Sequence, residues 1–217
     1  MKYDIFENDT YNLYTIETAK FKSAHMEVIF RTPATKENIT YLSLLASMLM
    51  ENSKKYPTRK LLARKMCDLY NANVYTVNSR VGGTIITNFV LDFLNPRYTD
   101  KETMEASIEL LFEMIFHPNA SDGEFDESTF ERIKRRINLD IDAIKEDPKQ
   151  ASILDAFKAL NANDVRSFNA NGDVLVLDSI TPRKLFKFYE EFLEKSPRDV
   201  YIIGDLDMKE VDKITRR

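Results

Sequence analysis

Alternation of apolar and polar residues predicts two strands early in the chain. It runs through residues 11–16 and 25–31, so each segment would bury one face and expose the other. Pro33 ends the second segment, because proline has no N–H to donate to a sheet.

Two further β-rich segments flank a turn near Gly82. Residues 74–77 and 83–91 contain many β-branched and aromatic residues, and a glycine turn between such runs predicts a hairpin of the main sheet. Residues 200–204, Val-Tyr-Ile-Ile-Gly, predict a last strand.

Between these strands, apolar residues recur every three or four positions, which is the pattern of helices with one buried face. The expected helices are 37–51, one from about Thr58, 103–116, 126–145, 149–160, one from Thr181-Pro182, and one from Met208 onward. Pro118 and Pro148 separate the three in the middle, because proline cannot continue a helix.

Side chains specify two of the helix starts. Thr58 and Thr181 can each accept a hydrogen bond from an N–H in the first turn, and Pro182 suits the first helical position because that N–H would have no partner anyway. The expected core faces are Leu61, Leu62, Met66 and Leu69 in the first of these helices, and Leu185, Phe188, Tyr189 and Phe192 in the second.

Length and composition indicate one globular domain. A chain of 217 residues with 43% hydrophobic and 30% charged residues can bury one sizeable core, so we expect a single domain over residues 1–217. No segment approaches the roughly 20 apolar residues that a membrane span needs. The last helix has barely begun at Arg217, and we therefore expect the domain to be the N-terminal half of a longer two-domain chain.

Charge and cysteine content narrow the partners and the compartment. A net charge of −4 gives no electrostatic reason to expect nucleic acid. The densest basic run is Lys54, Lys55, Arg59, Lys60, Arg64 and Lys65, and a solvated helix face explains it better than a site for a phosphate backbone. The N-terminus has no secretory signal, and the single Cys67 cannot form an internal disulfide, so we expect a cytoplasmic protein.

Several local signatures resemble an N-terminal domain of the M16 metallopeptidases, the family of pitrilysin and the mitochondrial processing peptidase. They are Phe116-His117-Pro118 followed by Phe130-Glu131-Arg132, the helix ending Lys145-Glu146-Asp147-Pro148, and Ile180-Thr181-Pro182 leading into Ile203-Gly204-Asp205-Leu206-Asp207. The resemblance covers nearly the whole chain. It implies an α+β domain, mainly an antiparallel sheet with helices packed on one face.

Active members of this family carry an HxxEH motif on the first long helix, where two histidines bind zinc and the glutamate activates water. Aligned on this chain, the histidine positions fall on Leu44 and Met48 and the glutamate position on Ser47, and none of these can serve. The third zinc ligand of the family falls near Asp140, a carboxylate with a shorter side chain. We therefore expect no catalytic residues, no metal and no cofactor, and a cleft filled by Leu44 and Met48.

Other residues do not rebuild the site. Glu51, one turn beyond Ser47, is the best local substitute carboxylate, but one carboxylate cannot hold zinc. His25 is expected to be a hydrogen-bonded strand residue and His117 a helix-terminal residue. Cys67 is expected in the core, and neither it nor Ser47 has the partner that a nucleophile needs.

The resemblance implies a catalytically inactive homologue that pairs with an active HxxEH-bearing M16 chain or with a second homologous domain, as in a group of small bacterial members encoded beside an active homologue. Its chemistry would be peptide binding by a sheet edge, at Val74 to Val77 or Gly83 to Phe89. Two alternatives stay open: a zinc metallopeptidase with an atypical site built on Asp140, Glu51 and another ligand, or a stand-alone peptide- or protein-interaction module.

Overall fold

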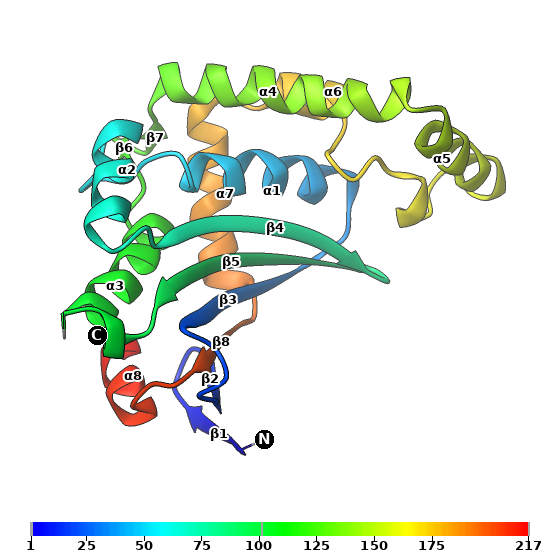
Figure 1. Cartoon of the computed structure of the whole chain (residues 1–217). Coiled ribbons are helices and arrows are strands. Elements are labelled where there is room, and N and C mark those ends of the chain that lie inside the picture. Colours follow the sequence, from blue (N-terminus) through cyan, green and yellow to red (C-terminus); the bar gives the residue numbers. More distant parts are fainter. Residues whose placement is uncertain (1, 101, 217) are drawn as a thin grey trace.

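The computed structural model describes residues 2–100 and 102–216, and its centre is a six-stranded sheet (Figure 1). The strands of this sheet are β1 (Lys2–Glu7), β2 (Asn12–Glu17), β3 (Ser23–Pro33), β4 (Asn73–Val81), β5 (Thr84–Leu94) and β8 (Arg198–Gly204). Two short strands, β6 (Ala120–Ser121) and β7 (Glu124–Phe125), pair separately.

Helices fill the connections between the strands. The α-helices are α1 (Lys36–Leu49), α2 (Arg59–Asp68), α3 (Thr103–Phe116), α4 (Glu127–Glu146), α5 (Pro148–Leu160), α6 (Val174–Ser179), α7 (Pro182–Lys195) and α8 (Met208–Thr215). Two 3-10 turns, η1 (Pro96–Tyr98) and η2 (Val165–Ser167), complete the described secondary structure.

The strand order is β1-β2-β8-β3-β5-β4, and the neighbours are antiparallel except for β2 and β8, which are parallel. The mostly antiparallel sheet with its helices confirms the α+β class. Strand β4 lies at one edge and β1 at the other, whereas β5 is paired on both sides. Of the two segments expected to bind peptide, 74–77 therefore lies at an edge, and the expectation for 83–89 is wrong because β3 and β4 occupy both of its sides.

Alternation along β3 fixes which face of the sheet is buried. Met26, Val28 and Phe30 are fully buried, whereas His25 and Glu27 on the opposite face are only partly so. Phe30 packs on Phe192 of α7 with 4.6 Å between the ring centroids, and residues of α1, α3 and α7 belong to the same hydrophobic cluster. Burial of each large apolar side chain contributes about 1.5–3 kcal/mol, so this interface holds the helices on the sheet.

The helix starts and the hairpin turn that were expected from the sequence are confirmed. Thr58 Oγ1 accepts from the N–H of Leu61, and Thr181 Oγ1 accepts from the N–H of Lys184, each over 3.3 Å. Gly82 has a φ of +57°, a left-handed conformation that glycine adopts without strain, and it turns β4 into β5.

The expected core face of α2 is only half right. Leu62 and Leu69 are buried, but Leu61 is 46% exposed. Cys67, on the same helix, is exposed as well. The helix is short and charged on most sides, so one narrow stripe reaches the core and the neighbouring apolar residues remain at the surface. The expectation of a core role for Cys67 is wrong for this reason. Most of the basic run around α2 is solvated, as expected.

Strand β1, helix α6 and the β6–β7 pair were not anticipated. Strand β1 has tyrosine and isoleucine side chains that are exposed, so its pairing with β2 leaves little hydrophobic signature. Helix α6 is only six residues long and the β6–β7 strands have two residues each, which is too short for a periodic pattern.

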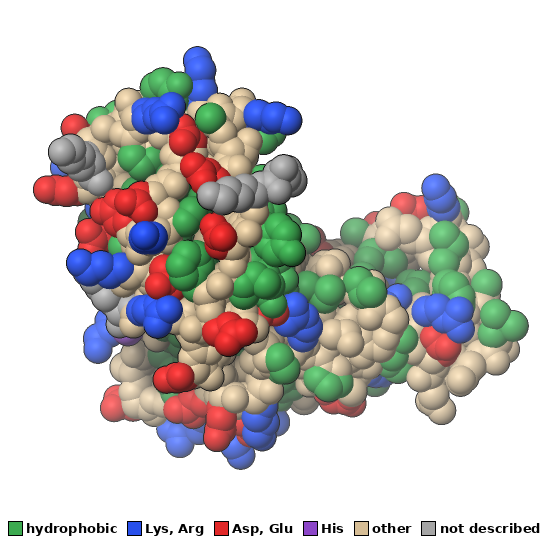
Figure 2. Space-filling model, turned by 90° about the horizontal axis from the view of Figure 1, so that it is seen from below, with side chains coloured by type: hydrophobic (Ala, Val, Ile, Leu, Met, Phe, Trp, Pro, Cys, Tyr) green, Lys and Arg blue, Asp and Glu red, His purple; other side chains and the backbone are tan. Residues whose placement is uncertain are grey.

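The end of α4 and the whole of α5 project from the body of the molecule as an arm (Figure 1). Seen from below, the arm stands apart from the main body and carries exposed hydrophobic side chains (Figure 2). No residue of α5 is fully buried, and Ile153 and Leu160 are exposed there. None of the helices that the structure describes combines the length and the apolarity that crossing a membrane requires.

Candidate functional site

The two positions aligned with zinc-binding histidines lie in the hydrophobic core. Leu44 has no exposed surface and Met48 is 3% exposed, and both belong to the same buried cluster as the isoleucines of α4 and Leu177 of α6. Ser47, aligned with the catalytic glutamate, is half-buried on α1. This part of α1 therefore presents apolar packing where an active relative would need a metal.

The position of the third zinc ligand lies outside this packing. Helix α4 buries a stripe of apolar side chains, which consists of Phe130, Ile133, Ile137 and Ile141. Asp140 falls off the stripe and its side chain is exposed, while its backbone oxygen accepts from Asn171 Nδ2 over 2.9 Å. The structure thus pairs two buried apolar residues with an exposed carboxylate, a set that does not bind zinc.

Glu51 is buried, but it is part of an ion-pair cluster. Its side chain is 4% exposed, and Oε1 lies 2.6 Å from Nη2 of Arg132 and 3.1 Å from Nε of Arg59. Helix α1 ends at Leu49, so the expectation that Glu51 continues the helical face of Ser47 is wrong: the residue follows the helix and turns toward α4. A carboxylate held by two guanidinium groups has little capacity left for a metal ion.

His25 is a hydrogen-bonded strand residue and His117 a helix-terminal residue, as expected. His25 bridges two carboxylates, with 2.6 Å from Nδ1 to Asp92 Oδ1 and 2.8 Å from Nε2 to Glu27 Oε1. Burial alone would lower the pKa of His25, but the two carboxylates favour the protonated ring and raise the pKa above its ordinary value. His117 caps the end of α3, with Nδ1 3.3 Å from Glu113 Oε2.

The described residues contain no cluster of three or more histidine, cysteine, aspartate or glutamate side chains placed to hold a metal ion.

A shallow groove of about 90 Å³ runs between α1 and the edge strand β4. Its walls include Leu42 and Ser43 of α1, Asn78 and Arg80 of β4, and Ala170. Asn78 Nδ2 donates to the backbone oxygen of Leu42 over 3.4 Å, which holds the strand beside the helix. The groove lies beside the end of the edge strand β4 that leads into the hairpin turn, and an extended chain could add to the edge of this strand.

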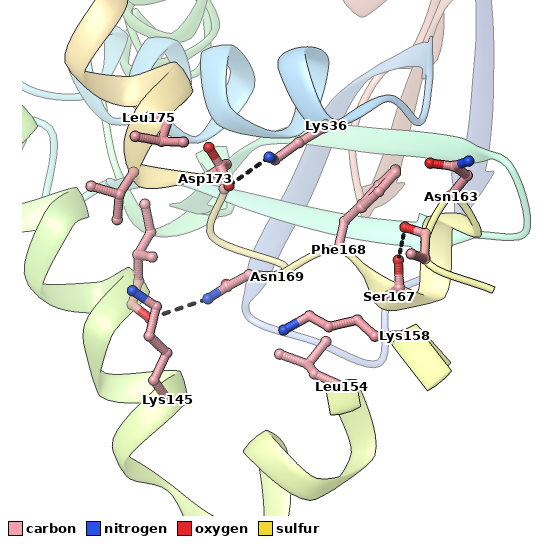
Figure 3. Close-up of a pocket in the computed structure, with 14 residues that line it drawn as sticks. Lys36, Lys145, Leu154, Lys158, Asn163, Ser167, Phe168, Asn169, Asp173 and Leu175 are labelled. Carbon is pink, nitrogen blue, oxygen red and sulfur yellow. Dashed lines mark hydrogen bonds and ion pairs between the residues drawn. The ribbon is translucent and has the colours of Figure 1, made fainter. Parts of the chain in front are cut away.

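A larger hollow of about 560 Å³ lies at the base of the arm (Figure 3). Lys36, Lys145 and Lys158 line it from α1, α4 and α5, together with Asp173 at the start of α6. No pattern in the sequence marks these four residues as a site. They are far apart in the chain and share no motif, so only the packing of four helices brings them together.

No protein-family model matches the chain. Over 200 residues, or 91% of its length, it is 26% identical to the "Probable inactive metalloprotease YmfF" of Bacillus subtilis (strain 168), of which it covers 47%. A conserved protein from Enterococcus faecalis V583, known from its crystal structure, matches 96% of the chain with a TM-score of 0.89 and 26% identity, over 49% of its own length.

A crystal structure of a "peptidase M16 inactive domain" from Pseudomonas fluorescens matches 99% of the chain with a TM-score of 0.76 and 17% identity, over 49% of its own length. That likeness shows the fold. The chain thus spans about half the length of each of these three proteins. The chain therefore has the fold of M16 peptidase domains and is similar in sequence to a protein named as a probable inactive metalloprotease.

Proposed function

We propose that this chain is a non-catalytic M16 domain, the N-terminal half of a longer chain, which helps an HxxEH-bearing homologue to enclose and position peptide. The burial of Leu44 and Met48 carries the proposal. Apolar residues that complete a core keep the domain folded at the place where a zinc site would otherwise interrupt the packing.

The length of the matched proteins supports pairing with a homologous domain. The chain covers close to half of each of them, so a second unit of similar size completes the molecule in these relatives. The active homologue would supply the zinc, both histidines and the catalytic glutamate, while this domain would supply binding surface.

The edge of β4 supports peptide binding. An extended peptide could pair with the backbone of β4 and lay alternate side chains into the groove beside α1. The opposite edge strand, β1, has no helix of the motif region beside it (Figure 1) and serves as an internal comparison.

A reconstitution experiment tests the proposal. Peptide cleavage and zinc content would be measured for this chain, for an HxxEH-bearing M16 homologue from the same genome, and for the mixture, alongside gel filtration of each. We expect no cleavage by this chain alone, a shift in elution volume on mixing, and faster cleavage by the mixture. An unchanged elution volume and rate would count against pairing, and near-stoichiometric zinc in this chain alone would favour an atypical peptidase.

Hydrogen exchange tests the binding edge separately. We expect an extended peptide to slow exchange of backbone amides in β4 (73–81) and to leave those of β1 (2–7) unchanged. Equal protection of both strands, or of neither, would contradict binding at the β4 edge.

A further inference from the structure

The hollow at the base of the arm gathers positive charge from three separate elements. Lys36, Lys145 and Lys158 line it from α1, α4 and α5, and Figure 3 shows these residues around one space. Its volume of about 560 Å³ falls in the range of small-ligand sites, which is roughly 300–1,000 Å³.

Among the described residues that line the hollow, Asp173 is the one carboxylate, and it is already engaged. Asp173 Oδ2 lies 2.8 Å from Lys36 Nζ, and Asp173 Oδ1 accepts from the N–H of Val176 at the start of α6. Positive charge therefore exceeds negative charge in the lining.

The other two lysines have partners that a ligand can replace. Lys145 pairs with Asp142 and Lys158 with Asp155, each three residues earlier on its own helix, and the side chains are between 46% and 74% exposed. Such intrahelical pairs at the surface contribute little stability, so both ammonium groups can turn toward an anion in the hollow at small cost.

The rest of the wall favours a peptide carboxylate over a phosphate. Apolar side chains, among them Phe168 and the largely exposed Leu175, suit the side chains of a peptide. The start of α6 would be the natural phosphate cradle, but Asp173 already caps it with a negative charge. An anion in the hollow would thus be bound by lysine side chains, because the N-terminus of α6 is already capped by Asp173.

The hollow adjoins the groove along β4. Residues 168 and 169 line the hollow and residue 170 lines the groove, so a single stretch of backbone separates them. Arg80 at the end of β4 donates to the backbone oxygens of Val165 and Phe168, which fixes this wall to the strand. A peptide along β4 that crosses this wall beside Arg80 would meet the three lysines.

We propose that the hollow binds carboxylate groups of a peptide that lies along β4, so that acidic peptides are the preferred substrate class. This inference rests on the proposed peptide binding. The carboxylates could belong to acidic side chains or to the C-terminus of the peptide, which share the same chemistry.

Fluorescence anisotropy with short labelled peptides tests this. The probes are an extended glutamate-containing peptide and its glutamine counterpart, each with a free and an amidated C-terminus, and inorganic tripolyphosphate as competitor. We expect the glutamate peptide to bind more tightly than the glutamine peptide, with the difference shrinking as salt screens the lysines. If only the free C-terminus, and not glutamate, increases the affinity, the hollow binds terminal carboxylates.

Matched variants locate the effect. Lys145→Gln/Lys158→Gln should weaken binding of the glutamate peptide about tenfold. Lys149→Gln/Lys187→Gln removes the same charge from the exposed faces of α5 and α7 and should change it little. Circular dichroism of each variant checks that both remain folded, which is expected because all four lysines lie at the surface.

The outcomes separate this inference from the proposed function. If the glutamine peptide protects β4 amides and glutamate adds no affinity, the inference is overturned while the proposed function stands. If the lysine variant loses affinity and β4 is not protected, the hollow is supported and the strand edge is not. Equal losses of affinity in the two double variants would overturn the inference. Displacement of the labelled peptide by tripolyphosphate at a lower concentration than by unlabelled glutamate peptide would also overturn it.

Discussion

Arg132 of α4 donates from Nη2 to Oε1 of the buried Glu51 over 2.6 Å, directly after the end of the helix that carries the degenerate motif. Arg59 approaches the same oxygen from α2. Residues of α2 and α4 therefore meet, at the end of α1, the carboxylate that the sequence offers as the best local substitute near Ser47. The geometry assigns it a structural role instead.

Replacing Arg132 should lower the free energy of unfolding more than replacing Glu51. Arg132→Met leaves the buried Glu51 carboxylate with Arg59 alone, and we expect the free energy of unfolding to fall by roughly 2 kcal/mol. Glu51→Gln leaves two arginines that can both reach water, because their side chains are 45% and 74% exposed, and should cost about 1 kcal/mol. Urea unfolding at neutral pH measures both.

Arg135→Met is the control for this pair, because Arg135 lies on the same helix with an exposed side chain, and its loss should be within about 0.5 kcal/mol. A larger cost for Glu51→Gln than for Arg132→Met would mean that the acid makes a contact beyond this ion pair.

Gly172 should tolerate no side chain. Its φ is +120°, and a Cβ built there would lie 2.9 Å from the Cα of Thr40, a backbone atom of α1 that cannot move aside. Gly172→Ala should therefore destabilise the protein by about 2 kcal/mol or more and loosen the loop that leads into α6. Thermal unfolding checks this. Gly83→Ala is the matched control, since nothing lies within 4 Å of the added carbon.

His25 should make stability depend on pH. Burial disfavours its charged form, but Asp92 and Glu27 reverse that effect, and the pKa in the folded state lies above the ordinary 6.5. The folded state thus binds the proton more tightly, so the contribution is complete below pH 6.5 and is lost as pH rises through the folded-state pKa. His25→Gln should lower stability most at mildly acidic pH and progressively less at alkaline pH.

Urea unfolding across the pH range compares wild type with His25→Gln. The side chain is 37% exposed, so solvent reduces the effect, and we expect less than about 1 kcal/mol. The same comparison in an Asp92→Asn background should show a smaller pH-dependent part. A difference between wild type and His25→Gln that grows with pH would contradict the assignment of the proton to this cluster.

The sequence carries most of the fold because its signals are local. Thr58 and Thr181 mark helix starts by the hydrogen bonds that their own hydroxyls accept, and the alternation along β3 survives into the observed burial. The same local signals wrongly predict burial of Cys67. The apolar residues near it suit a core, but the exposure of its side chain depends on which distant elements cover the helix, and no local pattern contains that information.

Some features of the candidate site can likewise be predicted from the sequence, and others require the structure. The expectation of no zinc site comes from the sequence, because the positions aligned with histidines hold Leu44 and Met48. Capture of Glu51 by Arg132, 81 positions away, and convergence of three lysines at the arm arise only from tertiary packing. Residue types at aligned positions can therefore be compared from the sequence alone, whereas contacts between distant side chains require the structure.

Restoring the zinc motif should not restore the enzyme. In Leu44→His/Ser47→Glu/Met48→His, two imidazoles and a carboxylate enter a helix whose positions 44 and 48 are almost fully buried, so each replaces apolar packing with a polar group that lacks a partner. The exposed Asp140 stands outside the stripe that faces this helix and gives no third ligand. We expect a lower melting temperature, substoichiometric zinc by elemental analysis and no peptide cleavage.

Leu44→Asn/Ser47→Gln/Met48→Gln separates the loss of packing from metal binding, because it introduces polar groups of similar size that bind zinc poorly. Added zinc should leave the melting temperatures of both triple variants unchanged. Selective stabilisation of the histidine variant by zinc, accompanied by cleavage, would show that a third ligand reaches the buried helix and that the domain retains the geometry of an active site.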